Sequence, residues 1–127
     1  MNVKKIIGWV LSALIVAMLM FSASFKLTDF EGKEEAFGKM GWGVEMMKTI
    51  GVIEIAVAFL YLIPRTAFIG AVLVTAYLGG AIATHVRVNE AAVFPIIMGV
   101  LAWVALGLRD CRIFTTAFTA PPKPTNT

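Results

Sequence analysis

Residues 46–86 read MMKTIGVIEIAVAFLYLI-PRT-AFIGAVLVTAYLGGAIATHV, two apolar runs of 18 and 20 residues with only three residues between them. About 20 predominantly apolar residues are enough for a helix to cross a bilayer. Neither run alternates apolar and polar side chains as a barrel strand does, so a helix is the form in which each can span a membrane. Pro64 lacks a backbone N–H and ends the first run. The short link therefore predicts two antiparallel helices.

Two further runs, at residues 6–25 and 91–108, have the same character. Because the links are short, the four runs predict an all-α fold, an integral membrane four-helix bundle with up-down-up-down order. The composition agrees, since 59% of the residues are hydrophobic and 15% are charged, whereas soluble domains average about 25% charged residues. We expect one domain over residues 1–118 and a disordered tail rich in Pro and Thr over residues 119–127.

The first run has one alternative interpretation, a cleaved secretory signal. Its apolar stretch is longer than the roughly 7–15 residues typical of such signals, which favours a retained helix. Basic residues near the ends of the runs predict orientation. One side carries six basic residues and the other carries five, and the first set flanks the runs more closely, so we expect both termini in the cytoplasm. The first set is Lys4, Lys5, Arg65, Arg109, Arg112 and Lys123; the second is Lys26, Lys33, Lys39, Lys48 and Arg87.

The loop between the first two runs, residues 26–45, has two interpretations. Phe30, Phe37 and Met40 recur at near-helical spacing among charged residues, which predicts a short amphipathic helix on the outer membrane surface. A polar loop with incidental aromatic residues explains the pattern equally well. On either interpretation, we expect Trp42 at the level of the lipid headgroups.

Several classes of chemistry have little support in the sequence. A single cysteine, Cys111, cannot form an internal disulfide or a thiol relay. His85 is the only histidine and has no neighbouring ligand pattern, so no metal site is predicted. The net charge of +3 is explained by membrane orientation, so we expect no binding of nucleic acid. No catalytic residue is assigned, and a non-catalytic role is favoured.

Ionisable residues inside the apolar runs are the strongest functional signal, because each costs about 2.5–3.5 kcal/mol to insert. In the predicted bundle, Lys26, Glu54, His85 and Arg87 converge near the outer end, with Tyr77 and Trp103 as apolar walls. We expect an ion pair of Glu54 with Lys26 or His85, and a second between Arg87 and Glu90. The cluster is either a structural ion pair that fixes helix register or a ligand or proton site. The small residues Ala76, Gly80 and Thr84 predict close helix packing on the third run.

The chain resembles the DoxX-like family of small bacterial four-helix membrane proteins. The resemblance rests on FKL at 25–27, GW at 41–42, GVIE at 51–54, LIPRT at 62–66 and GAIATHVR at 80–87. Gly43 stands where the family pattern has proline. The resemblance implies a bacterial inner-membrane location. It also implies an association with quinone-linked oxidation of sulfur compounds or with oxidative-stress partners, and it carries over no catalytic residue.

Three functional hypotheses follow. The first is a non-catalytic, multi-pass inner-membrane subunit or accessory of a redox or stress-response system. It would bind a small amphipathic ligand, such as a quinone or a lipid headgroup, through Lys26, Glu54, Tyr77, His85 and Arg87. Its partners would be the lipid bilayer, redox-partner membrane subunits and a second copy of the chain. The second hypothesis is a proton-coupled small-molecule exporter that uses Glu54, and the third is a purely structural scaffold.

Overall fold

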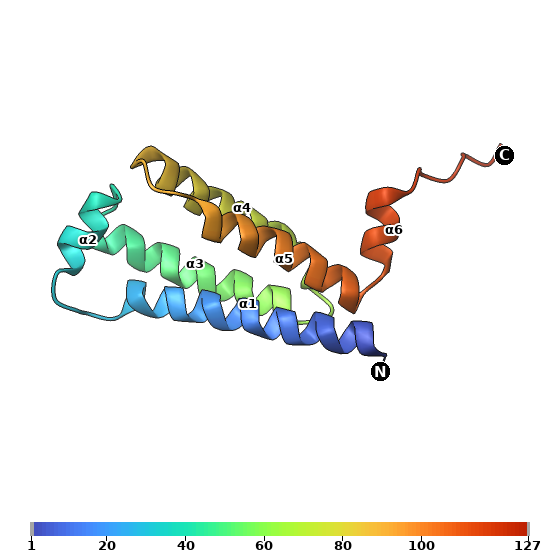
Figure 1. Ribbon diagram of the computed structural model, residues 1–127, viewed down its shortest axis with the longest axis horizontal. Helices are drawn as coiled ribbons and strands as arrows, with labels where there is room; N and C mark the ends of the chain where they lie inside the picture. The colour runs from blue at the N-terminus through green and yellow to red at the C-terminus, as the bar shows by residue number, and fades with distance from the viewer. Residues whose placement is uncertain (1, 127) are drawn as a thin grey trace.

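The computed structural model describes residues 2–126, and this part of the chain forms helices and no strands (Figure 1). Four helices are long and two are short. In order they are α1 (Val3–Leu27), α2 (Lys33–Lys39), α3 (Val44–Leu62), α4 (Ala67–Arg87), α5 (Val93–Arg109) and α6 (Arg112–Phe118). The all-α class is confirmed, and the long helices cover the four predicted runs to within a few residues.

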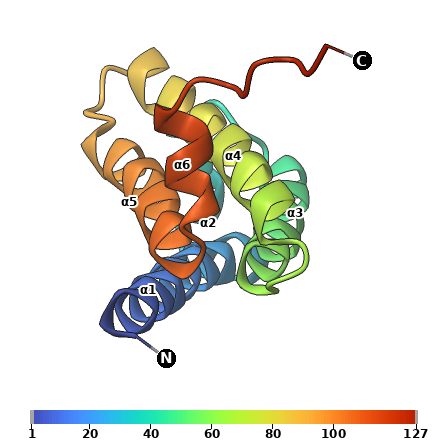
Figure 2. The ribbon, with the colours of Figure 1, turned by 90° about the vertical axis from the view of Figure 1, so that its right-hand side faces the viewer.

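The four long helices pack in a ring (Figure 2). Helix α1 contacts α3 and α5, and α4 contacts the same two helices. Within the described chain, the diagonal pairs α1–α4 and α3–α5 have no Cα atoms within 8 Å of each other. The centre of the ring must therefore be filled by side chains or stay open.

The end of the ring next to the α3–α4 link is well packed. Val74 and Ala102 are fully buried there, and so is Tyr61, whose hydroxyl donates to the carbonyl oxygen of Ala102 at 2.8 Å. A Cβ atom at Gly70 would lie 2.2 Å from the backbone nitrogen of Tyr61. Only glycine allows α3 and α4 to approach this closely just after the proline turn.

The four carbonyl groups in the last turn of α3 are satisfied by three residues. The amide of Ile63 donates to Phe59, and the Thr66 hydroxyl donates to Leu60 at 2.7 Å. The guanidinium of Arg109 donates to the carbonyl oxygens of Tyr61 and Leu62, both at 3.1 Å. Because these carbonyls have no partner within the helix, Arg109 completes the C-terminus of α3 from a neighbouring helix.

Length and composition identify fewer membrane spans than the four predicted. Among the described helices, α1 and α4 pass as candidate spans, and α5 passes only if joined to α6, from which it is bent by 117°. Helix α3 contains Glu45, Lys48 and Glu54, while α5 has 17 residues. Helix α3 thus fails as a candidate span because it carries three charged residues, and α5 fails because it is short.

Of the two short helices, α2 was predicted from the sequence and α6 was not. Helix α2 confirms that the first loop contains a short helix, and its residues Lys33 and Phe37 are buried. Helix α6 turns back because the ring of Phe114 packs directly on Gly107, where a Cβ atom would clash with that ring. Residues 119–126 form no helix or strand.

Candidate functional site

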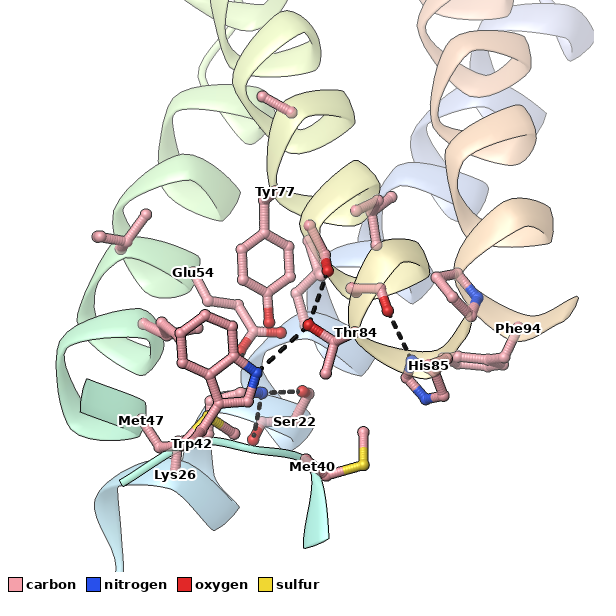
Figure 3. Close-up of a pocket in the computed structure, with 18 of the residues that line it drawn as sticks. Ser22, Lys26, Met40, Trp42, Met47, Glu54, Tyr77, Thr84, His85 and Phe94 are labelled. Carbon is pink, nitrogen blue, oxygen red and sulfur yellow. Dashed lines mark hydrogen bonds and ion pairs between the residues drawn. The ribbon is translucent and has the colours of Figure 1, made fainter. Parts of the chain in front are cut away.

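A cavity of about 390 Å³ occupies the ring at the end that carries α2 (Figure 3). All four long helices contribute to its lining, together with residues from the α2–α3 connection. Most of the wall is apolar, with side chains such as Leu19, Met47 and Phe94. Helix α4 contributes the small residues Ala76 and Gly80, which leave the space unfilled.

The small residues of α4 correct one expectation. Ala76, Gly80 and Thr84 were predicted to pack a neighbouring helix, yet all three line the cavity. In the described chain, a Cβ atom built at Gly79 or Gly80 meets no atom within 4 Å. Small residues favour close packing only when the facing helix also approaches, and here α1 lies diagonally across an open centre.

A buried ion pair forms the polar part of the lining. The Lys26 ammonium lies 2.9 Å from Oε2 of Glu54, whose side chain is only 1% exposed. Lys26 also donates to Ser22, at 2.6 Å to Oγ and 3.4 Å to the carbonyl oxygen. Gly51, one turn before Glu54, lets α3 approach the Cβ atom of Lys26. Of the two partners predicted for Glu54, Lys26 and His85, the structure shows the ion pair with Lys26.

Two further predicted residues, Tyr77 and His85, also line the cavity. The Tyr77 hydroxyl points toward the Glu54 carboxylate (Figure 3). Nδ1 of His85 lies 2.7 Å from the carbonyl oxygen of Ala81. A carbonyl oxygen only accepts, so Nδ1 carries the proton, and Nε2 is the acceptor of a neutral ring.

The connection Met40–Gly41–Trp42, here called the strap, covers one side of the cavity. Trp42 donates its indole N–H to the Thr84 hydroxyl at 3.3 Å. Arg87 donates to the carbonyl oxygen of Met40 at 2.6 Å and places its guanidinium 5.5 Å from the Trp42 ring centre. Gly41 adopts a φ of +82°, and a Cβ atom there would collide with Arg87. The strap is therefore held in place by α4.

Arg87 and Trp103 do not lie where the sequence analysis placed them. Among the described residues Arg87 makes no ion pair with Glu90, so that prediction is wrong, and Arg87 is not part of the cavity lining. Its long side chain reaches back to the strap instead. Trp103 lies outside the lining and donates to the Thr75 hydroxyl at 2.7 Å.

Two polar residues of the lining were not among the predicted site residues. One is Ser22, whose position one helical turn before Lys26 was a signal that the two side chains could meet. Trp42 was expected only to lie at headgroup level, and it also lines the cavity. No local signal showed that the strap folds over the cavity, because that depends on Arg87, 45 positions further along the chain.

A second polar cluster lies at the opposite end of the ring. Arg109 is only 8% exposed, donates to the Ser12 hydroxyl at 3.2 Å, and stacks on Trp9 with its guanidinium carbon 4.0 Å from the ring centre. Within residues 2–126 it has no carboxylate partner, and its Nε has no hydrogen-bond partner. The sequence predicted Arg109 only as a flanking charge that sets orientation.

The described residues contain no group of three or more His, Cys, Asp or Glu side chains placed to hold a metal ion. Cys111 is exposed near the start of α6. The lining of the cavity offers hydrogen bonding and apolar contact around one ion pair.

Comparison with known proteins identifies the family. The sequence model of the DoxX-like family matches residues 10–105, which include the whole cavity lining and the strap. No curated protein and no solved structure matches the chain. The matched segment ends before Arg109 and α6. Since it covers most of the chain, this protein belongs to the DoxX-like family.

Proposed function

We propose that this DoxX-like membrane protein binds a small amphipathic ligand in the cavity beside Lys26 and Glu54. In this role it acts as a non-catalytic subunit or accessory protein, either of a quinone-linked redox system or of a stress-response system. It resides in the bacterial inner membrane with both termini in the cytoplasm. The bilayer-spanning elements are α1, α3, α4 and α5, in alternating directions.

The distribution of charge supports α3 as a span. Glu54 is the one charged residue in its middle, and it is neutralised by Lys26 inside the ring. Glu45 and Lys48 lie in the first turns, where they pair with each other at 3.6 Å and can reach the membrane surface.

Helix α5 is supported as a span by its exposed face. Its 17 residues give a length of about 26 Å, close to the roughly 30 Å of a bilayer core. Val93, Ile97 and Val100 are each about half exposed or more, which suits contact with lipid. Successive long helices also run in opposite directions in Figure 1.

The observation that carries the ligand proposal is the cavity itself. Small-molecule sites are typically about 300–1,000 Å³, mostly apolar, with a few polar groups that orient the ligand. The cavity matches this description in volume and in lining. A chain used only as a scaffold would be expected to close such a space, because voids in packed interiors are destabilising.

Two adjacent glycines provide a matched test. Gly80 lines the cavity and Gly79 does not, and both have open space around their Cβ positions. Leucine at either position keeps the helix, since it replaces the poorer helix former. The measurement is native mass spectrometry of protein purified gently from its own membranes, with identification of small amphipathic molecules that remain bound.

We expect a bound molecule on wild type and on Gly79→Leu, and its loss on Gly80→Leu. Equal retention by all three proteins, or none on any of them, would contradict the proposal. The mass of the released molecule separates a quinone from a lipid. Intact masses in the same experiment report redox-partner subunits and self-association.

A further inference from the structure

We infer that the cavity selects ligands with an uncharged, hydrogen-bonding head and discriminates against anionic and cationic heads. This inference rests on the proposed function and specifies its ligand class. It follows from the state of each ionisable group at the cavity, because both cations that could attract a charged head already have other partners.

The floor of the cavity has no net charge to offer. Lys26 has three N–H donors, and it has three acceptors within 3.4 Å, namely Oε2 of Glu54 and the two oxygens of Ser22. A ligand anion could bind this ammonium only by displacing one of them. A ligand cation could reach Glu54 only through its second carboxylate oxygen, beside the Lys26 ammonium, which already neutralises the carboxylate and would repel a second positive charge.

The second cation near the site is outside it. Arg87 is absent from the lining and is held by the Met40 carbonyl oxygen and the Trp42 ring. The remaining polar groups of the lining are neutral hydrogen-bonding groups. The Thr84 hydroxyl already donates to Gly80 and accepts from Trp42.

Two neutral groups remain for a ligand head, the Tyr77 hydroxyl and Nε2 of His85. The Tyr77 hydroxyl points toward the Glu54 carboxylate (Figure 3), so it offers a ligand its oxygen as an acceptor, and Nε2 of His85 also accepts. These groups suit an amide or an alcohol. A head with a net charge would bring an uncompensated ion into an apolar cavity, which strongly disfavours its binding.

The volume of the cavity determines how large the probe molecules can be. At about 30 Å³ for each water-sized unit, 390 Å³ holds roughly a dozen non-hydrogen atoms. Decanamide, decanoate and decylamine match this size and share one tail but carry neutral, anionic and cationic heads. Their binding is measured at about pH 8, where imidazole groups are ordinarily neutral, by displacement of a decanamide analogue that carries a photoreactive diazirine. Gly80→Leu gives the background from lipid.

Wild type should bind decanamide at least about tenfold more tightly than either charged probe. Glu54→Gln leaves Lys26 unpaired, so its preference should shift toward decanoate. Lys26→Met leaves Glu54 unpaired and should shift the preference toward decylamine. The double variant Lys26→Met/Glu54→Gln has neither charge and should again prefer decanamide, and it keeps the test valid if a single variant fails to fold.

The exposed pair of Arg112 with Asp110, at 2.7 Å near the opposite end of the ring, supplies matched controls. Asp110→Asn and Arg112→Met change the net charge by the same amounts and should not change the preference. The inference is overturned if wild type binds a charged probe as tightly as decanamide, or if the single variants keep the wild-type order. Failure of all three probes to bind above the Gly80→Leu background would overturn the proposed function as well.

Discussion

The most informative perturbation of the fold is the removal of Arg109, which bonds the end of α3 to α5 and α1. Its guanidinium donates to the carbonyl oxygens of Tyr61 and Leu62 and to the Ser12 hydroxyl. Hydrogen bonds that involve a charged group contribute about 1.5–3 kcal/mol each, and a stacked cation adds about 0.5–2 kcal/mol. Desolvation of an arginine without a carboxylate partner offsets several kcal/mol of this sum.

The net prediction is that Arg109→Ala lowers the free energy of unfolding by about 2–4 kcal/mol. Arg109→Lys should recover less than half of this, because an ammonium group cannot reach two adjacent carbonyls and stack on Trp9 as the planar fork does. The assay is reversible unfolding in mixtures of mild detergent and sodium dodecyl sulfate. Arg112→Ala is the control, since Arg112 is exposed and should change stability little.

Full stability in Arg109→Ala, or full recovery by lysine, would refute this reasoning. Either result would mean that the last carbonyls of α3 find other partners, such as water, at no cost. A loss of stability in Arg112→Ala equal to that in Arg109→Ala would show a general effect of positive charge rather than a specific contact.

Three other perturbations test neighbouring features. Lys26→Met or Glu54→Gln alone should cost about 3–5 kcal/mol of unfolding free energy and the double variant clearly less; additive losses would contradict a buried pair. Gly70→Ala should destabilise strongly in the same assay, because its Cβ would overlap the backbone of α3; unchanged stability would show that the helices can separate there. Gly41→Ala and Arg87→Ala should each speed amide hydrogen exchange in the strap without unfolding the ring, and unchanged exchange would show that Arg87 does not hold it.

Much of the fold could be predicted because it depends on local patterns. The apolar runs locate the long helices, and Pro64 locates the tight link between α3 and α4. The Lys26–Glu54 pair was predictable for an energetic reason, since an unpaired carboxylate inside an apolar run is costly. Lys26 and His85 were the two candidate partners at the matching level of other helices.

The features that could not be predicted from the sequence depend on how the helices are placed relative to one another. Arg87 and Arg109 look alike in the sequence, each closing an apolar run, yet one reaches the strap and the other enters the ring. The direction of such long side chains follows from the separation of neighbouring helices, which no single run encodes. The small residues of α4 were misassigned for the same reason, because Gly80 indicates close packing or open space according to where α1 lies.

Helix α6 could not be predicted from the sequence for a different reason. Its seven residues are too few for a periodic pattern to be distinctive. The contact that orients it, Phe114 on Gly107, joins two elements across a sharp bend. Local sequence therefore gave no basis for predicting it.

The central claim is that the ring is open to a ligand at the end where Lys26 meets Glu54. Photolabelling with the diazirine analogue of decanamide, followed by peptide mass spectrometry, tests it most directly. We predict labelled residues on the cavity walls, such as Met47 and Tyr77, with labelling suppressed by excess decanamide and by Gly80→Leu but not by Gly79→Leu. Labels confined to outward-facing residues such as Val10 and Phe68, unaffected by either treatment, would contradict the claim.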